Sequence, residues 1–350
     1  MGFSLFPSLG RDELARRVGS LDQLGGATRM TFTEGPARQM EAIEVRSGGG
    51  LAFQILPDRG MGLGLASLCG VPLCWVSAAG AVAPWYYNPV GGGWLQSFGG
   101  GLMTSCGLTN VGSACRVDGI EVGLHGRMSH TAARDVAIER RWIGDSHHVS
   151  VSGTILDYAV LGPALEARRT YRVVLGENRI WLHDEVANPG PRPQPLFLLY
   201  HFNFGYPLLS ETAVLDIAPR ETVTARDPAY AEAAADWRRL DAPRFGAEER
   251  VLHHRLCGGD ETEARIRLEN QVGDARLAVE MTFPLAALSH LTEWKMMGER
   301  EYVLGLEPGT CFASGREDAL ARGDVEILAP GATKAVDLSL SFSLTPNRSA

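Results

Sequence analysis

Polar and apolar residues alternate with a period of two along much of the chain. The alternation is clearest in residues 168–175, 179–186, 264–269, 275–283 and 336–344. A period of two places every second side chain on the same face, so each segment is expected to form a β-strand with one buried and one hydrated face. Strands of this kind are typical of antiparallel sheets. The pattern therefore predicts an all-β fold of antiparallel sheets.

Helical signals are confined to three short segments, residues 12–18, 228–237 and 314–321. The third begins with Ser314 and has Glu317 three positions later, which is the spacing of a capping box. None of the three could organise a domain, and no GxGxxG motif follows a strand. Because no linker or internal repeat divides the chain, we expect residues 1–350 to form a single β-sandwich domain, with residues 1–25 as a helical N-terminal extension.

Residues 91–112 are unusually rich in glycine and contain eight of them. The same stretch carries large apolar side chains, among them Trp94, Phe98 and Met103, which a disordered linker would lack. Glycine permits tight bends and close backbone approach. We interpret the stretch as a packed, irregular loop beside a site. A set of bulges and turns at a sheet edge is the alternative.

Composition limits the classes of partner and the compartment. Hydrophobic residues make up 45% of the chain and charged residues 21%, which is enough apolar material for a large core. The net charge of −8 argues against nucleic acid as a partner. No apolar run approaches the roughly 18 residues of a membrane span. Residues 1–19 have no basic region followed by an apolar one, so a secretory signal is not expected and the cytoplasm is the expected location.

The chain has six cysteines, and none of them forms a CxxC pair. In a long chain without a secretory signal, we expect free thiols rather than disulfides or a structural zinc site. The six are Cys69, Cys74, Cys106, Cys115, Cys257 and Cys311.

His201 is a candidate catalytic residue because of its neighbours. It follows an apolar run and shares one face of the predicted strand with Asn203, while Phe202 and Phe204 share the other. A histidine and an amide beside aromatic rings suit a sugar, which needs hydrogen bonds at its hydroxyls and apolar contact at its C–H faces. The alternative is a buried histidine held by a backbone carbonyl.

Glu307 and His125 are candidates for the same reason. Glu307 directly follows the apolar residues 302–306, so partial burial should give it a partner or a raised pKa. The alternative for Glu307 is a structural salt bridge to Arg316 or Lys295. His125 precedes Gly126, which would let a ligand approach, and its alternative is a turn histidine that caps a backbone group.

Four further histidines lie in two adjacent pairs. The pairs at 147–148 and 253–254 lie beside charged residues, and we expect all four of these side chains to be exposed to solvent. A metal site formed by His125, His201 and a carboxylate is left open, because sequence spacing does not decide it.

In their order along the chain, these segments resemble the galactose mutarotase-like superfamily. Aldose 1-epimerases have an upstream arginine, a His-Gly motif, a later histidine at a strand end and a Leu-Glu-Pro-x-Thr segment, which correspond here to Arg59, His125-Gly126, His201 and residues 306–310. The closer resemblance is to a bacterial branch known as domain of unknown function 4432. It covers the chain from about residue 51 onward and rests on residues 58–60, 70–73, 98–102, 106–109, 124–127, 201–209, 294–296 and 306–308.

The resemblance implies a large antiparallel β-sandwich, a small-molecule sugar as partner and no cofactor. Glu307 would take the proton of the anomeric hydroxyl, and protonated His201 would give one to the ring oxygen. The two side chains should then face a common cavity about one sugar ring apart. The resemblance also suggests substrate-binding residues, which are Arg59, His125, Arg127, Asn203, Lys295 and Asp58. A homodimer is compatible with the sequence.

The sequence departs from galactose mutarotases in ways that keep other activities open. Their Asn-His-x-Tyr segment is replaced by Tyr-His-Phe-Asn-Phe at residues 200–204, and the aspartate that selects their sugar hydroxyls has no clear equivalent. Mutarotation of a free sugar is the leading hypothesis. The first alternative is a keto-sugar epimerase or isomerase that works through an enediolate, with or without a metal. The second is a sugar-binding protein without catalysis.

Overall fold

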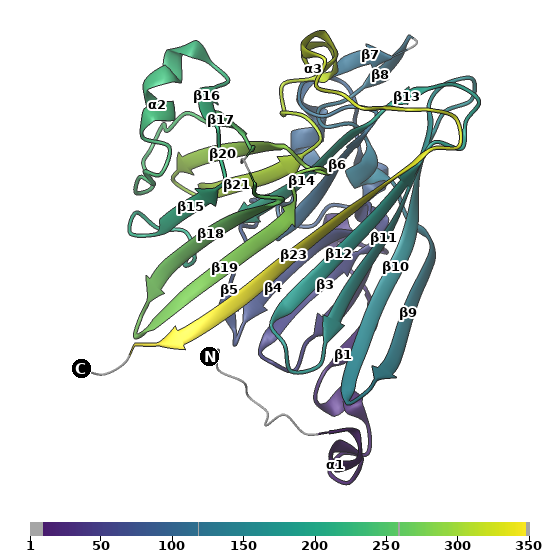
Figure 1. The fold of residues 1–350 in the computed structure, drawn as a ribbon, viewed down its shortest axis with the longest axis vertical. Coiled ribbons are helices and arrows are strands. Elements are labelled where there is room, and N and C mark those ends of the chain that lie inside the picture. The colour runs from purple at the N-terminus through teal and green to yellow at the C-terminus, as the bar shows by residue number, and fades with distance from the viewer. Residues whose placement is uncertain (1–9, 118, 258–259, 348–350) are drawn as a thin grey trace.

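The computed structural model describes residues 10–117, 119–257 and 260–347. Two large antiparallel sheets pack face to face, and the few short helices lie at their ends (Figure 1). Strand makes up about 50% of the structure and helix 13%. The predicted all-β, antiparallel architecture is therefore confirmed.

The first sheet has 11 strands and carries the candidate site. From one edge to the other it consists of β1 (Gly26–Thr31), β2 (Glu41–Arg46), β3 (Leu51–Leu56), β4 (Gly62–Leu68) with β5 (Val71–Pro72) beside it, β6 (Met103–Leu108), β14 (Phe197–Phe204), β21 (Glu301–Gly309), β20 (His290–Gly298), β17 (Arg250–Arg255) and β16 (Thr222–Ala225).

The second sheet has eight strands, and five of them contain the segments with the clearest alternation. In order these strands are β15 (Val214–Ala218), β18 (Glu263–Val272), β19 (Ala275–Pro284), β23 (Thr333–Pro346), β12 (Arg179–Ala187), β11 (Ala164–Val174), β10 (Ser146–Tyr158) and β9 (Arg134–Ile143). One face of β12 and β23 is buried and the other is open, as a period of two requires.

Short elements complete the fold. Two small sheets pair β13 (Gln194–Pro195) with β22 (Ile327–Leu328) and β7 (Cys115–Val117) with β8 (Ile120–Val122). The α-helices are α1 (Arg11–Ala15), α2 (Ala231–Ala235) and α3 (Arg316–Arg322). The 3-10 turns are η1 (Leu21–Gln23), η2 (Gly35–Ala37), η3 (Pro57–Arg59), η4 (Pro84–Tyr86), η5 (Gly91–Ser97), η6 (Met128–His130) and η7 (Pro228–Tyr230). Within the described residues, no helix is long and apolar enough to cross a membrane.

Two local predictions were wrong in part. The N-cap of α3 is Gly315 and not Ser314, and no side chain makes a capping hydrogen bond there. The glycine-rich stretch is not irregular throughout, because residues 103–108 form the buried strand β6 between the irregular residues 98–102 and 109–112. The backbone of β6 pairs with that of β14. The small side chains and the single glycine of β6 give no local signal for a strand, so the sequence did not indicate this pairing.

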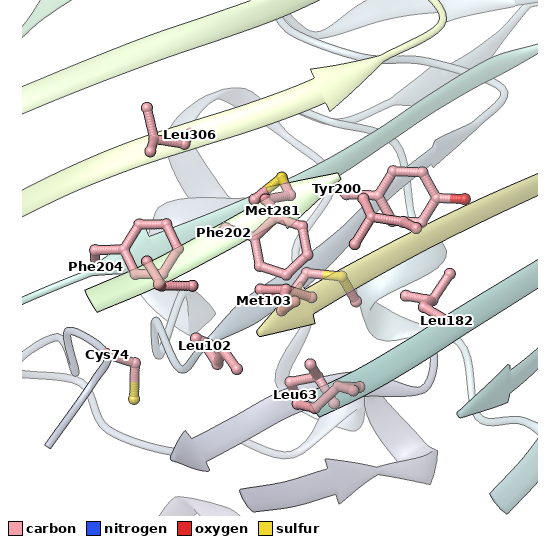
Figure 2. Close-up of a cluster of buried hydrophobic side chains, with 14 of the residues drawn as sticks. Leu63, Cys74, Leu102, Met103, Leu182, Tyr200, Phe202, Phe204, Met281 and Leu306 are labelled. Atoms are coloured by element: carbon pink, nitrogen blue, oxygen red, sulfur yellow. The ribbon is translucent and has the colours of Figure 1, made fainter. Parts of the chain in front are cut away.

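The core between the sheets is built from the inward faces of both. Tyr200, Phe202 and Phe204 of β14 point inward from the first sheet and lie close to Leu182 and Met281 of the second (Figure 2). All five are at most 1% exposed. The alternation on β14 therefore has the consequence that His201 and Asn203 lie on the opposite, outer face of the first sheet.

A buried charged cluster joins the two sheets behind the candidate site. Arg169 and Asp184 are both fully buried, and the guanidinium donates two hydrogen bonds to the carboxylate, at 2.8 and 2.6 Å. Tyr200 of the first sheet donates to the same carboxylate at 2.8 Å, and Arg169 donates to Ser105 of β6. Every oxygen of Asp184 is thus partnered, which is the condition under which a buried ion pair is tolerated.

Replacing Asp184 by alanine is expected to lower the free energy of unfolding by about 3–5 kcal/mol, because it leaves the buried Arg169 charge without its partner. Urea unfolding followed by circular dichroism measures this loss. The matched control is Asp337→Ala, because Asp337 is an exposed aspartate of the same sheet and forms an ion pair with the half-exposed His183. That change should cost less than about 1 kcal/mol. Equal losses in the two variants would contradict the structural role of the cluster.

Candidate active site

His201 and Glu307 are brought together by the pairing of two neighbouring strands. Leu199 lies opposite Gly309 and Phe202 opposite Leu306, and this register places His201 level with Glu307. Nε2 of His201 lies 3.2 Å from Oε1 of Glu307. A Cβ at Gly305 would lie 2.7 Å from the same oxygen, so glycine at this position leaves room for the carboxyl group. The two residues are in direct contact, not one sugar ring apart as the sequence had suggested.

Burial dominates the electrostatics of this pair. His201 is 4% exposed and Glu307 2%. Burial lowers the pKa of His201 to about 4 and raises the pKa of Glu307 well above its usual range, with Arg226 opposing the second shift. Both shifts act in the same sense, because each disfavours the charged form. The neutral imidazole and the protonated carboxyl are therefore the favoured forms.

Asn203 lies next to His201 on the outer face of β14, two residues farther along the strand. It is fully buried, and its amide donates to the carbonyl oxygens of Gly101 and His201, at 3.1 and 3.0 Å. Its side chain also raises the pKa of His201, which offsets part of the effect of burial. Asn203 does not line the cavity described below, so it is a neighbour of His201 that lies outside this cavity.

His125 reaches the site from a loop held against the sheet. The loop stays close because Gly107 donates its N–H to the His125 carbonyl at 3.0 Å and His125 donates its own to Gly112 at 2.8 Å. A Cβ at Gly126 would lie 2.7 Å from the Gly107 carbonyl oxygen. Gly126 thus serves the approach of the loop to β6, and not the approach of a ligand.

The tautomer of His125 follows from its contacts. Its Nδ1 accepts the Gly112 N–H at 3.3 Å, so the ring carries its proton on Nε2. Burial, together with the charges of His201 and Arg226, lowers the pKa of His125 to about 3. The backbone of His125 has a φ of +57°, a conformation that costs a non-glycine residue about 1–3 kcal/mol. His125 is therefore a neutral hydrogen-bond donor held at a conformational cost.

His201, Glu307 and His125 line a cavity of about 170 Å³, which we call the His201–Glu307 cavity. Its walls are aromatic. The centroid of the His201 ring lies 5.3 Å from that of Phe98 and 5.5 Å from that of Trp294. The ring centroids of Trp94 and His125 are 5.0 Å apart. Trp94 and Phe98 come from the glycine-rich stretch, so the prediction that this stretch lies beside the site is consistent with its position.

Two charged residues that the sequence did not single out also line this cavity. Arg226 and Glu249 form an ion pair at 2.6 Å, and Trp294 donates its indole N–H to Glu249 at 3.1 Å. Both charged side chains are about half exposed, which places them at the mouth. The segments that carry them are locally rich in charge, and nothing in their sequence separates them from an ordinary hydrated surface.

Lys295 and Arg127 point elsewhere. Trp294 faces the cavity, so by alternation Lys295 faces the opposite side of β20, where it pairs with Glu293 at 3.2 Å and donates to the Arg239 carbonyl at 2.9 Å. Arg127 pairs with Asp157 at 2.6 Å and lines a different hollow. The suggested sugar-binding roles of both residues do not fit these positions.

Asp58 and Arg59 lie on the turn η3, outside the His201–Glu307 cavity. Asp58 accepts the backbone N–H of Glu41 at 2.7 Å, which ties η3 to β2. Arg59 donates to the Ser97 carbonyl at 2.9 Å and lines a neighbouring cavity. Neither residue lines the His201–Glu307 cavity.

The prediction that four further histidines are exposed was wrong. His147, His148, His253 and His254 are between 0% and 9% exposed. His254 donates or accepts a hydrogen bond with the fully buried Glu293 at 2.8 Å, and His253 stacks on Phe312. Adjacent charges in sequence did not indicate exposure, because neighbours in a strand point to opposite faces.

Histidine and carboxylate side chains can also hold a metal ion. Among the residues that the structure describes, no group of three or more histidine, cysteine, aspartate or glutamate side chains is arranged to hold a metal ion.

Comparison with known proteins identifies the family and the fold of the chain. Residues 37–342 match a sequence family described as domain of unknown function DUF4432. Among curated proteins, none has a sequence that matches the chain. A candidate aldose 1-epimerase from Klebsiella pneumoniae superposes with a TM-score of 0.83 at 25% identity, over 92% of this chain and 86% of that one.

Two more distant structures share the fold. A galactose mutarotase-like protein from Clostridium acetobutylicum has a TM-score of 0.61 at 13% identity, over 93% of this chain and 99% of that one. Galactose 1-epimerase from Lactobacillus acidophilus has a TM-score of 0.56 at 14% identity, over 91% and 99%. At these identities the likeness concerns the fold alone.

Proposed function

The chain belongs to the DUF4432 family and has a galactose mutarotase-like fold, and from this premise we propose that it is an aldose 1-epimerase that interconverts the anomers of a free sugar. The observation that carries the proposal is the contact between His201 and Glu307, which is buried at the base of a cavity with aromatic walls. Aromatic rings suit the C–H faces of a sugar, and the buried pair suits proton transfer.

The direct contact fits the reaction better than a wider separation would. Anomer interconversion removes a proton from the anomeric hydroxyl and adds one to the ring oxygen, and both oxygens are bonded to the same carbon. Two groups in contact with each other can reach both oxygens at once. An acid–base pair of this kind typically contributes about 10²–10⁴-fold to the rate.

The preference for neutral forms sets the starting roles. His201, as neutral imidazole, accepts the proton of the anomeric hydroxyl, and Glu307, as carboxylic acid, gives its proton to the ring oxygen as the bond from that oxygen to the anomeric carbon breaks. The products are the open-chain aldehyde, an imidazolium and a carboxylate. After rotation about the C1–C2 bond, ring closure returns both protons and restores the neutral pair. These roles are the reverse of those that the sequence suggested.

The other cavity residues are assigned to binding. His125 carries its proton on Nε2 and can donate it to a sugar oxygen. Trp294, Phe98 and Trp94 supply apolar contact. Arg226 and Glu249, at the mouth, can bind hydroxyl groups that lie away from the anomeric carbon.

The proposal is tested by measuring anomer exchange by NMR with purified protein and a panel of pentoses, hexoses, deoxysugars and uronic acids. We expect faster exchange than in buffer for at least one sugar, unchanged by a metal chelator. The control is the same protein after heat denaturation. Formation of a new epimer or a ketose would instead indicate the enediolate isomerase. Saturable sugar binding without faster exchange would indicate a binding protein.

A further inference from the structure

A second cavity of about 180 Å³ lies beside the first, and we call it the Arg59 cavity. The two are separated by adjacent residues of one segment, because Ser97 lines the Arg59 cavity and Phe98 lines the other. Leu65 and Val76, which are 55% and 43% exposed, lie at its mouth. Most of its wall is apolar and is contributed by Phe32, Met40, Leu56, Leu63, Val82 and Met103.

Arg59 is the one charged residue among those that line this cavity. Its side chain comes from η3, and the residue is 8% exposed. Nη2 donates to the Ser97 carbonyl at 2.9 Å, but Nη1 is buried and has no hydrogen-bond partner. In the described part of the chain, no carboxylate forms a salt bridge with this guanidinium, and its neighbour Asp58 is occupied by the backbone of Glu41.

A buried cation without a counterion is costly. Burial lowers the pKa of Arg59 to about 10, so the guanidinium is still charged at neutral pH. The effective penalty for such a charge is several kcal/mol when no partner compensates it. A buried guanidinium with a free N–H donor is therefore an arrangement that an anion entering the cavity would stabilise.

The chemistry of the neighbouring groups narrows the choice of anion. The hydroxyl of Ser97 donates to the Trp94 carbonyl and contacts His130, and that of Ser129 accepts the Trp94 indole N–H. Thr104 donates to the Gly100 carbonyl at 3.4 Å. Because these hydroxyls are already engaged, the cavity offers one cation and, besides it, the side-chain amide of Gln54, whose Oε1 accepts the Leu65 N–H at 3.4 Å. A doubly charged phosphate would need more donors, whereas a carboxylate would not.

We propose that the Arg59 cavity binds a small organic carboxylate with an apolar body, with its carboxylate on the Arg59 guanidinium and its hydrocarbon part against the apolar wall. This site is distinct from the His201–Glu307 cavity, and it does not depend on the proposed epimerase activity. A bound carboxylate would contact Ser97, the last residue of η5. The next residue, Phe98, lines the His201–Glu307 cavity, so the two cavities meet at the end of η5.

Isothermal titration calorimetry with hexanoate and with hexanamide tests the proposal. The two probes have similar shapes, and only the first is charged. We expect saturable binding of hexanoate and at least about tenfold weaker binding of hexanamide, as the loss of a charge-assisted hydrogen bond implies. Arg59→Met should weaken hexanoate binding by a similar factor. Arg168→Met, which removes an exposed arginine of β11, is the matched control and should leave it unchanged.

Two further measurements keep the test decisive if Arg59→Met does not fold. Val76→Phe fills the mouth without touching the guanidinium and should also abolish hexanoate binding. A crystal grown with 6-bromohexanoate should place the anomalous bromine signal inside the Arg59 cavity. The proposal is overturned if hexanoate does not bind, if Val76→Phe binds it normally, or if the bromine lies in the His201–Glu307 cavity.

Discussion

Replacing Glu307 by glutamine is expected to lower kcat by about 10²–10⁴-fold and to leave sugar binding nearly unchanged. Glutamine keeps the shape of the side chain and its contact with His201, but it has no acidic proton to give to the ring oxygen. The loss therefore concerns an interaction made in the transition state and not in the ground state. Anomer exchange by NMR gives kcat, and calorimetric titration of the sugar gives Kd.

Coupling between the two residues makes the test sharper. His201→Asn should lower kcat by a similar factor, and the double variant should be little worse than either single one, because both residues serve one proton cycle. Glu301→Gln, an exposed glutamate of the same strand, is the matched control and should retain full activity. Full activity of Glu307→Gln, or strictly multiplicative losses in the double variant, would contradict the proposed mechanism.

The stability of the protein is expected to fall steeply as the pH drops from 6.5 to 4.5. Burial is the largest cause of a lowered pKa at seven histidines, and the shift is large at five of them. The pKa values are about 3 for His125, about 2 for His130, and about 4 for His201, His253 and His290. In the unfolded chain each would titrate near 6.5. Below that pH the unfolded state takes up protons that the folded state does not, so acid favours unfolding.

The magnitude follows from proton linkage. As the pH falls from the unfolded to the folded pKa, each such histidine lowers the free energy of unfolding by up to about 1.4 kcal/mol per pH unit. Glu307 acts in the opposite sense, because its pKa is raised in the folded state and acid stabilises its buried, protonated form. Its effect cancels that of about one histidine. For the five histidines with large shifts, the free energy of unfolding should therefore fall by at most about 5 kcal/mol per pH unit.

Urea unfolding at pH 7.5, 6.5, 5.5 and 4.5 measures this slope. His253→Phe should reduce the slope by about one proton, because it removes a buried histidine that stacks on Phe312 and whose Nε2 has no hydrogen-bond partner. His183→Gln, which changes a half-exposed histidine, is the matched control and should leave the slope nearly unchanged. A free energy of unfolding that is constant over this pH range would mean that these histidines are not buried in neutral form.

Local sequence determined much of the architecture. Alternation of polar and apolar residues predicted five strands of the second sheet, because the period of two is imposed by the pleat of any single strand. It also placed His201 and Asn203 on the face opposite Phe202 and Phe204. The order of the short motifs along the chain was enough to indicate the family.

The arrangement of the site was decided by tertiary structure. His201 and Glu307 lie 3.2 Å apart because of the register between β14 and β21, and register is set by pairing across the sheet and not by either strand alone. The same alternation, applied to Trp294, would have excluded Lys295 from the cavity. No local signal could distinguish Arg226 and Glu249 from surface charges, because their place at the mouth depends on how distant segments meet.

The charge states of the site also depend on the fold. The ordinary pKa of a histidine side chain is near 6.5. Burial in the assembled sheets lowers the pKa of His201 to about 4 and raises the pKa of Glu307. Desolvation is a property of the packed neighbours, which are far apart in the chain. The sequence thus determined which residues could carry the chemistry, while the tertiary structure decided which of them meet and in which direction burial shifts their pKa values.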